Sequence, residues 1–166
     1  MSSGRYSLRR AEAEDAAGIA AVHRQAREAA YDGLAPAATI ADHIARTGED
    51  YWCARLPAIL AGDDLLAVAE ADRRPVGFVH QCGERLHRLY VSPPWWGSGI
   101  APSLFLLARD HALSSGHGRL ILDAHAGNAR ARAFYARLGG CETGERIDRF
   151  ADGTPAPVVD LVWNLG

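Results

Sequence analysis

Short runs of apolar residues, several of them alternating with polar ones, recur along the chain and predict β-strands. We expect strands at residues 5–10, 65–69, 76–81, 86–91 and 120–122, with two more on either side of Asp152-Gly153. The three runs in the middle of the chain follow one another so closely that they predict an antiparallel meander. Asp-Gly is a strong signal for a tight hairpin, so the last two strands should also be antiparallel.

Apolar residues spaced three or four positions apart predict helices between these strands. The first helix follows the acidic stretch 12–15, which suits a helix N-terminus, and stops at Asp32-Gly33. Further helices are expected at residues 37–46, 52–61, 102–113 and 128–138, and Gly116 and Gly118 suit the end of the fourth one. No linker or internal repeat interrupts this order. The pattern therefore predicts a single α/β domain over residues 1–166, built on a mixed sheet.

The composition is that of a globular protein, since 48% of the residues are hydrophobic and 23% are charged. A formal net charge of -2 without like-charge runs argues against nucleic acid or an anionic membrane as a partner. No apolar stretch approaches the roughly 20 residues of a membrane span, and the N-terminus does not resemble a signal peptide. We therefore expect a cytoplasmic protein. All 18 Lys and Arg positions are arginine, which together with abundant alanine indicates a GC-rich bacterial genome.

Cys53, Cys82 and Cys141 lie far apart in the sequence and form no C-x-x-C pair. An odd number of isolated cysteines is typical of free thiols in a reducing compartment. Since free cysteine is among the most buried residue types, we expect all three to be buried. No disulfide and no bound metal are expected.

The most informative segment, residues 89–101, runs from a predicted strand through a glycine-bearing loop into a predicted helix. Backbone N–H groups at a helix N-terminus lack an intrahelical partner, and the helix dipole adds positive potential there. Gly97 and Gly99 let the backbone approach a ligand closely, and Pro102 fits a first helical turn. This arrangement predicts a phosphate-binding loop. The dinucleotide fingerprint needs a third glycine where Pro102 stands, and the P-loop needs a lysine, so neither motif fits.

Two motifs resemble the signatures of the GNAT acetyltransferase superfamily. The first is Val91-Ser92-Pro93 followed by Trp96-Gly97-Ser98-Gly99-Ile100-Ala101, which is similar to V-x-P with [QR]-x-x-G-x-[GA]. It departs from that pattern at Trp96, which stands in place of Gln or Arg. The second, residues 128–139, is similar to N-x-x-A-x-x-F-Y-x-x-x-G, although Gly140-Cys141 stands where a Phe is usual. The motifs occur in the family's order, and the resemblance extends over essentially the whole chain.

The resemblance implies an N-acetyltransferase that uses acetyl-CoA, with a mostly antiparallel sheet of six or seven strands flanked by helices. The fourth strand would separate from the fifth, and the pantetheine arm would lie in the gap like an added strand. The residues assigned to the cofactor in this way are Leu89 and Val91 for the pantetheine amides, Trp96, Gly97, Ser98, Gly99, Ile100 and Ala101 for the pyrophosphate, and Asn128 for a further pantetheine hydrogen bond. Tyr135 would lie near the sulfur and protonate the leaving thiolate as the catalytic acid.

The catalytic base remains open after this comparison. The family often uses a glutamate on the fourth strand, but Arg85 occupies that position here, next to Glu84. A shift of one residue turns a side chain to the other face of a sheet, so Glu84 does not simply inherit the role. His87 and His80 are further candidates, because an imidazole suits a base near neutral pH. In a fourth alternative no residue is needed, since the neutral fraction of the amine binds directly.

The acceptor implied by the resemblance is a primary amine of a small molecule or peptide, which attacks directly in a ternary complex. The polar or aromatic residues expected around it are Tyr31, Trp52, His80, His87 and Arg149. A second copy of the chain, in a homodimer, is a further partner to consider. The alternative function is a CoA-binding sensor or scaffold without turnover, against which the presence of Tyr135 argues.

Overall fold

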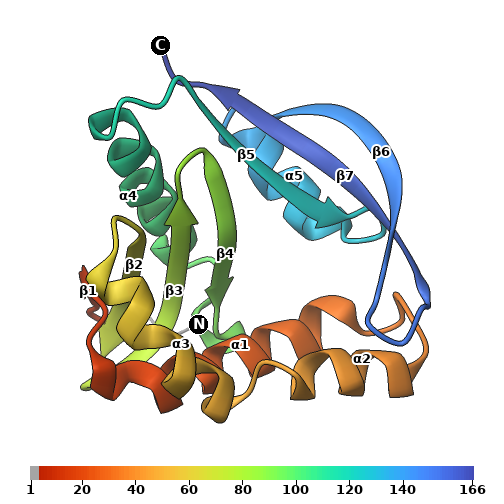
Figure 1. Cartoon of the computed structure of the whole chain (residues 1–166), viewed down its shortest axis with the longest axis horizontal. Coiled ribbons are helices and arrows are strands. Elements are labelled where there is room, and N and C mark those ends of the chain that lie inside the picture. The colour runs from red at the N-terminus through yellow and green to blue at the C-terminus, as the bar shows by residue number, and fades with distance from the viewer. Residues whose placement is uncertain (1–3) are drawn as a thin grey trace.

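The computed structural model describes residues 4–166 and shows a seven-stranded sheet with helices on both faces (Figure 1). The elements are β1 (Ser7–Arg10), the short 3-10 helix η1 (Ala13–Asp15), α1 (Ala16–Tyr31), α2 (Ala37–Ala45), α3 (Glu49–Ala61), β2 (Leu65–Ala71), β3 (Arg74–Cys82), β4 (Arg85–Val91), η2 (Pro93–Trp95), α4 (Ile100–Ser114), β5 (Arg119–His125), α5 (Ala129–Arg137), β6 (Cys141–Arg149) and β7 (Pro155–Asn164). The strand order is β1-β2-β3-β4-β5-β7-β6, and only β4 and β5 pair in parallel. The prediction of an α/β fold with a mixed, mostly antiparallel sheet is confirmed.

Strands β2, β3 and β4 form the predicted meander, and α1 and α3 cover one face of it (Figure 1). The turn between β2 and β3 is made by Asp72 and Arg73, whose φ angles are 49° and 62°. Both helices turn apolar side chains toward the strands. Ile19 of α1 and Trp52 of α3 reach zero exposure against Phe78 of β3. This core fixes α1 against the sheet, with its C-terminal end extending past β4.

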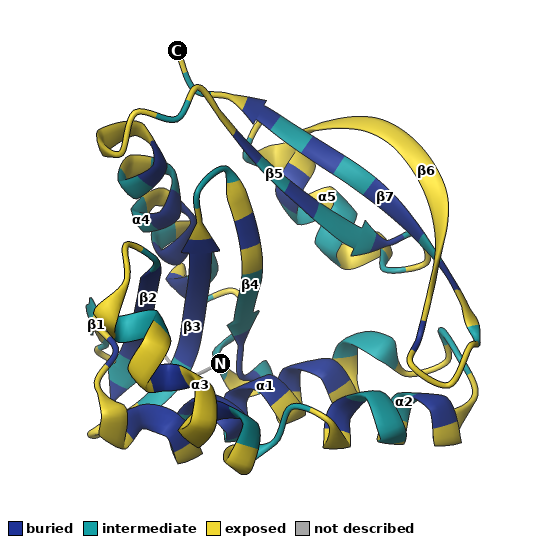
Figure 2. Cartoon of the chain, in the orientation of Figure 1, coloured by how far each residue is buried: buried dark blue, intermediate teal, exposed yellow. Residues whose placement is uncertain are grey.

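Helix α4 covers the opposite face and joins the two halves of the sheet. Leu104 and Phe105 are buried in one core with Leu161 and Trp163 of β7. Helix α5 packs against the same core, since the rings of Tyr135 and Trp163 lie 5.7 Å apart. Figure 2 shows the result as buried strands in the middle of the sheet and an exposed β6 at its edge.

The C-terminal hairpin of β6 and β7 leans on α2. The hydroxyls of Thr39 and Thr154 lie 3.2 Å apart, and the rings of His43 and Phe150 lie 5.3 Å apart. These contacts hold α2 and the end of α1 across from β5, and so enclose the space between them. Over residues 4–166, no helix combines the length and the apolar character needed to cross a membrane.

The sequence-based prediction is wrong about the cysteines and about the starts of two helices, since α3 begins at Glu49 instead of residue 52. Cys53, Cys82 and Cys141 are free thiols, but all three are exposed. Their positions explain this, because they lie on the outside of α3, at the end of β3 and at the start of the edge strand β6. In addition, α4 begins at Ile100 instead of residue 102, because Gly99 caps it in the left-handed conformation, with φ of 90°.

Candidate active site

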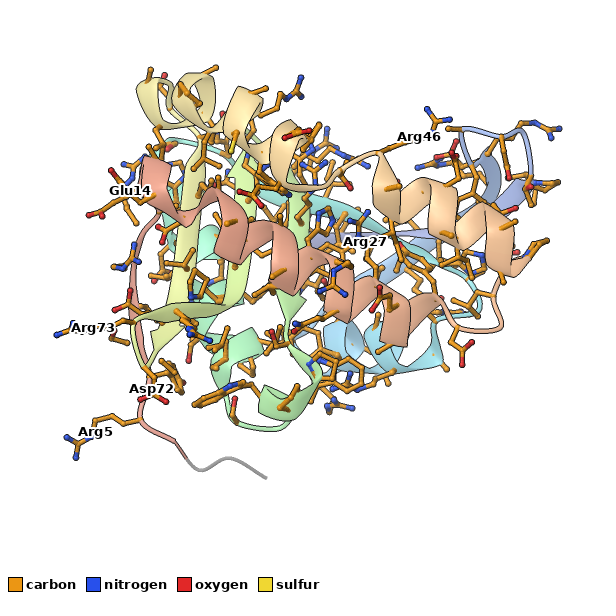
Figure 3. All side chains as sticks on the ribbon, turned by 90° about the horizontal axis from the view of Figure 1, so that it is seen from below. Arg5, Glu14, Arg27, Arg46, Asp72 and Arg73 are labelled. Carbon is orange, nitrogen blue, oxygen red and sulfur yellow. The ribbon has the colours of Figure 1, made fainter. Side chains whose placement is uncertain are left out.

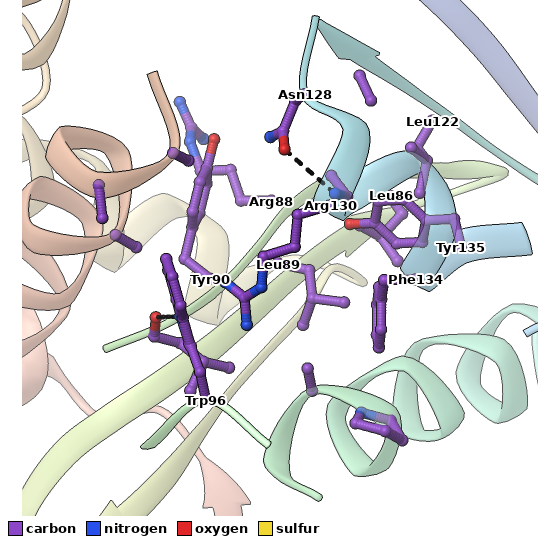
Figure 4. A pocket seen from close by; sticks show the side chains of 18 of the residues that line it. Leu86, Arg88, Leu89, Tyr90, Trp96, Leu122, Asn128, Arg130, Phe134 and Tyr135 are labelled. Carbon is purple, nitrogen blue, oxygen red and sulfur yellow. Dashed lines mark hydrogen bonds between the residues drawn. The ribbon is translucent and has the colours of Figure 1, made fainter. Parts of the chain in front are cut away.

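The central feature of the site is a separation between β4 and β5. The two strands are paired only where Arg85 faces Ile121, and β4 then diverges without a further β5 partner. The gap forms a cavity of about 580 Å³ whose walls come from α1, β4, the loop before α4, β5 and α5. Figure 4 shows side chains from these elements converging on it. The splayed fourth strand implied by the family resemblance is present.

A β-bulge interrupts the regular pairing in the middle of β4. His80 of β3 faces Arg88, whereas its neighbour Gln81 faces Leu86, so His87 is an extra residue on β4. Leu86, His87 and Arg88 around the bulge all belong to the cavity lining, as do the next three residues of β4.

The exposed edge of β4 carries free backbone groups toward the cavity. Ser92 N–H donates to Val76 O at 2.9 Å, and backbone bonds alternate along an antiparallel strand. Leu89 and Val91 therefore direct their backbone N–H and C=O groups away from β3. One of these groups is already paired, since the Trp96 indole N–H donates to Val91 O at 2.8 Å. The structure thus leaves Leu89, but not the Val91 carbonyl, available for a ligand's amide.

The loop before α4 presents an open helix N-terminus. Gly97 and Gly99 have φ angles of 77° and 90°; a Cβ at Gly97 would meet nothing within 4 Å and one at Gly99 only the Tyr6 hydroxyl, at 3.6 Å. Within the described chain, no side chain caps α4. Ser98 and Ile100 depart from the prediction, because neither belongs to the cavity lining. The Ser98 N–H already donates to Trp95 O, and Ile100 is fully buried in the core.

Asn128 and Arg130 line the cavity from the start of α5. The Asn128 side chain accepts from Ala131 N–H at 3.1 Å and caps the helix, which leaves its amide N–H₂ free to donate. The Arg130 guanidinium lies 3.3 Å from the centre of the Trp96 ring, a close cation–π stack. Arg130 therefore supplies a positive charge directly above the loop (Figure 4).

Tyr135 reaches the cavity from the next turn of α5. Its ring packs against Phe134 and Trp163, and the residue is only 8% exposed. Burial raises the pKa of the Tyr135 phenol, and the nearby Tyr90 raises it further, so the hydroxyl keeps its proton at neutral pH. The Tyr135 hydroxyl makes no hydrogen bond to another described residue and points into the cavity (Figure 4).

The sequence of residues 26–140 matches the acetyltransferase (GNAT) family. The chain belongs to the GNAT acetyltransferase family. It is 32% identical over 99 residues to a Salmonella typhimurium protein named peptidyl-lysine N-acetyltransferase YjaB, and the match spans 59% of this chain and 63% of that relative. Its fold is similar to that of a GCN5-related N-acetyltransferase from Rhodopseudomonas palustris, with 24% identity, a TM-score of 0.81 and 99% of each chain covered. YncA from Salmonella typhimurium, whose structure holds acetyl-CoA, is 19% identical with a TM-score of 0.74, over 97% of this chain and 94% of YncA.

The three base candidates of this GNAT chain occupy different surroundings. His87 lines the cavity, and burial together with the charges of His80, Arg85 and Arg88 lowers its pKa. Glu84 lies in the turn before β4, outside the lining, and its carboxylate accepts from Arg119 Nε at 2.7 Å. His80 lies behind His87, with ring centres 5.1 Å apart, and its Nε2 is 2.7 Å from an Asp64 oxygen. Of the three, only His87 has access to a ligand in the cavity.

The predicted acceptor residues are divided in the same way. Tyr31 lines the cavity from the end of α1. Trp52 was wrongly expected there, because it faces the sheet from α3 and is 0% exposed in the core. His80 and Arg149 are also outside the lining; the Arg149 guanidinium donates to Gly153 O within the β6–β7 hairpin. Of the five residues expected around the acceptor, the cavity lining therefore contains Tyr31 and His87.

Several cavity residues were not anticipated from the sequence: Leu86, Arg88, Tyr90, Asp123, Arg130 and Phe134. Phe134 and Arg130 lie inside the second family motif, so that motif already marked their helix. Arg88 and Tyr90 lie on the predicted strand, but residues 86–91 line a cavity only because β4 separates from β5 after Arg85. Asp123 lies on β5, and its place in the cavity follows from the position of β5 opposite β4, which the sequence pattern does not give.

Proposed function

We propose that the protein transfers an acetyl group from acetyl-CoA to a primary amine by direct attack in a ternary complex. The observation that carries the proposal is the single cavity that joins an uncapped helix N-terminus, a free strand edge and the Tyr135 hydroxyl. These features suit the three parts of acetyl-CoA, which are phosphates, amides and a thioester. Acetyl-CoA supplies an activated acetyl group: the amine nitrogen bonds to the acetyl carbon, the carbon–sulfur bond breaks, and one proton passes overall from nitrogen to sulfur.

The residues of the chain divide the binding work by chemistry. The amides of Gly97, Gly99 and Ala101 would bind phosphate oxygens at the positive end of α4. The backbone of Leu89 would pair with the pantetheine amides in the manner of an added strand. Arg130 stands above the loop without a carboxylate partner among the described residues, so its charge remains available to a phosphate.

Two side chains would move the protons. Tyr135 is protonated at neutral pH and lacks a protein partner, so its hydroxyl would donate to the leaving sulfur. His87 is neutral at neutral pH because its pKa is lowered, so one of its nitrogens would accept the amine proton. Cys53, Cys82 and Cys141 do not line the cavity, which supports direct attack over an acetyl-enzyme.

Calorimetry and thiol release test the proposal together. Acetyl-CoA should bind without an added divalent ion, and a panel of amines should include acceptors that release CoA thiol. Absence of binding at millimolar acetyl-CoA, or binding that requires a metal, refutes the cofactor assignment. Tight binding without thiol release from any acceptor supports the alternative, a CoA sensor or scaffold.

A further inference from the structure

The cavity contains more unpaired positive than negative charge. Arg88, Arg130 and Arg137 line it, and none of them forms an ion pair anywhere in residues 4–166. The carboxylate of Asp123 also lines it, but it already accepts from Arg85 at 2.9 Å and from Arg146 at 2.7 Å. An arginine keeps its charge at any working pH, so an unpaired one in a concave site favours an anionic ligand.

Arg130 and Arg88 lie at different ends of the cavity. Arg130 stacks on Trp96 beside the loop assigned to the phosphates. Arg88 comes from the bulge in β4 and extends toward α3, where its Nη2 donates to the Tyr51 hydroxyl at 3.0 Å. Its guanidinium also lies 5.1 Å from the Trp52 ring centre. These contacts hold Arg88 in one orientation, and the Tyr51 hydroxyl is the single hydrogen-bond acceptor found for its guanidinium among residues 4–166.

A buried cation reinforces the charge on this side. Arg27 lies on α1, next to lining residue Ala26, and is only 2% exposed (Figure 3). Its guanidinium donates to backbone carbonyls alone: to His23 O at 3.0 Å and to His43 O and Ile44 O at 3.5 Å each. Burial lowers the pKa of His43, and the charge of Arg27 lowers it further, as does that of Arg88. Both arginines therefore act on the region between α1 and α2, next to the cavity wall that α1 forms.

We propose that the acceptor is a small amine that also carries a carboxylate, as amino acids do, and that Arg88 binds this carboxylate. This inference rests on the acetyltransferase function proposed above and names its substrate class. The guanidinium charges of Arg88 and Arg27, which have no carboxylate partner among residues 4–166, repel an acceptor whose only charge is an ammonium and attract one that also brings an anion. The same potential favours the neutral form of the bound amine, which is the form that attacks. Arg88 is thus a specificity-determining residue that does not touch the reacting atoms.

Matched acceptors test this assignment. Thiol release is measured with the standard amino acids, with the primary amide of each, and with a lysine peptide blocked at both ends. For the preferred amino acid, kcat/KM should exceed that of its amide by about 10–100-fold, the range for a charge-assisted hydrogen bond. Arg88→Gln should bring this ratio close to unity, mainly by raising the KM of the acid, and Arg88→Lys should retain part of it. Arg55→Gln is the control, because Arg55 also lies over the Tyr51 ring, at 5.4 Å, but is outside the cavity lining.

A binding measurement keeps the test independent of turnover. The CoA-loaded protein is titrated with N-acetyl amino acids and with the corresponding N-acetyl amides, and only the acids should bind, in a manner that Arg88→Gln abolishes. Equal binding or equal kcat/KM for acids and amides overturns the assignment of Arg88, and so does a preference for the blocked lysine peptide. If CoA binds and no acceptor is acetylated, the acetyltransferase proposal fails, while the titration still decides whether Arg88 is an anion site.

Discussion

Replacing Tyr135 by phenylalanine isolates the chemical role of one hydroxyl. The phenol makes no hydrogen bond to another described residue, and its ring contacts with Phe134 and Trp163 persist after the change. Deleting a polar group that has no protein partner leaves no orphaned donor or acceptor behind. We therefore expect the free energy of unfolding to change by less than about 1 kcal/mol, or a few degrees in Tm.

The expected loss lies in the chemical step. Positioned general acids contribute about 10²–10⁴ in rate. A thiolate is a good leaving group and needs this help less than an alkoxide would, so we expect Tyr135→Phe to lower kcat by about 10–10³. Acetyl-CoA affinity should stay within a few-fold of the parent. The assay combines steady-state thiol release at saturating acceptor with calorimetry for CoA.

Tyr90→Phe is the matched control, because it removes a second hydroxyl from the lining of the same cavity. A similar loss of kcat in both variants would indicate a general effect of cavity polarity. If Tyr135→Phe weakens CoA binding as much as it lowers kcat/KM while kcat is unchanged, Tyr135 only positions the cofactor. Full activity would remove Tyr135 from the mechanism and make water the proton donor.

Three further predictions concern the loop, the base and the core. Gly99→Val should weaken acetyl-CoA binding at least 10-fold by placing a side chain over the phosphates, whereas Gly116→Val, with a similar φ of 85° at the other end of α4, should alter only stability. With His87 as the base, kcat/KM should rise with pH through a pKa below the ordinary 6.5 and then level off, and His87→Ala should abolish that rise; a profile that follows only the acceptor's own pKa excludes His87. Burial lowers the pKa of His23 to about 2. As pH falls, the unfolded chain therefore protonates this imidazole before the folded chain does. The stability linked to the neutral imidazole is complete above pH 6.5 and is lost as pH falls below that value. Urea denaturation should show a loss between pH 7 and pH 5 that is smaller in His23→Phe by about 2 kcal/mol; equal losses would contradict the buried neutral imidazole.

Local patterns were sufficient to predict the parts of the site that are local in sequence. The strand, the glycines and the helix start of residues 89–101 are adjacent, so chain geometry alone brings the loop to the end of α4. The orientation of β4 side chains is different, because the bulge at His87 depends on pairing with β3 at His80 and Gln81. No property of residues 85–91 by themselves reveals it.

Helical periodicity likewise located α3 without showing which side of it would face the acceptor. As an aromatic residue Trp52 is expected around the acceptor, yet packing against Phe78 and His23 buries it completely. The cysteines were misjudged for the opposite reason. Free thiols tend to be buried, but the place of a residue in the fold decides its exposure. Cys53 lies on the outer face of a helix and Cys141 lies at the edge of the sheet, so both are exposed.

The departure from the family motif at Trp96 becomes intelligible only with α5 in place. A glutamine or arginine at this position would bring its own polar side chain to the loop. Here the indole N–H closes the last carbonyl of the β4 edge, and the indole ring supports the Arg130 guanidinium at 3.3 Å. A guanidinium held by a ring instead of a carboxylate keeps its net charge and its N–H edge for a ligand. Arg130 of α5 thus supplies the cation that the loop itself lacks, and the stack on Trp96 holds it beside the loop.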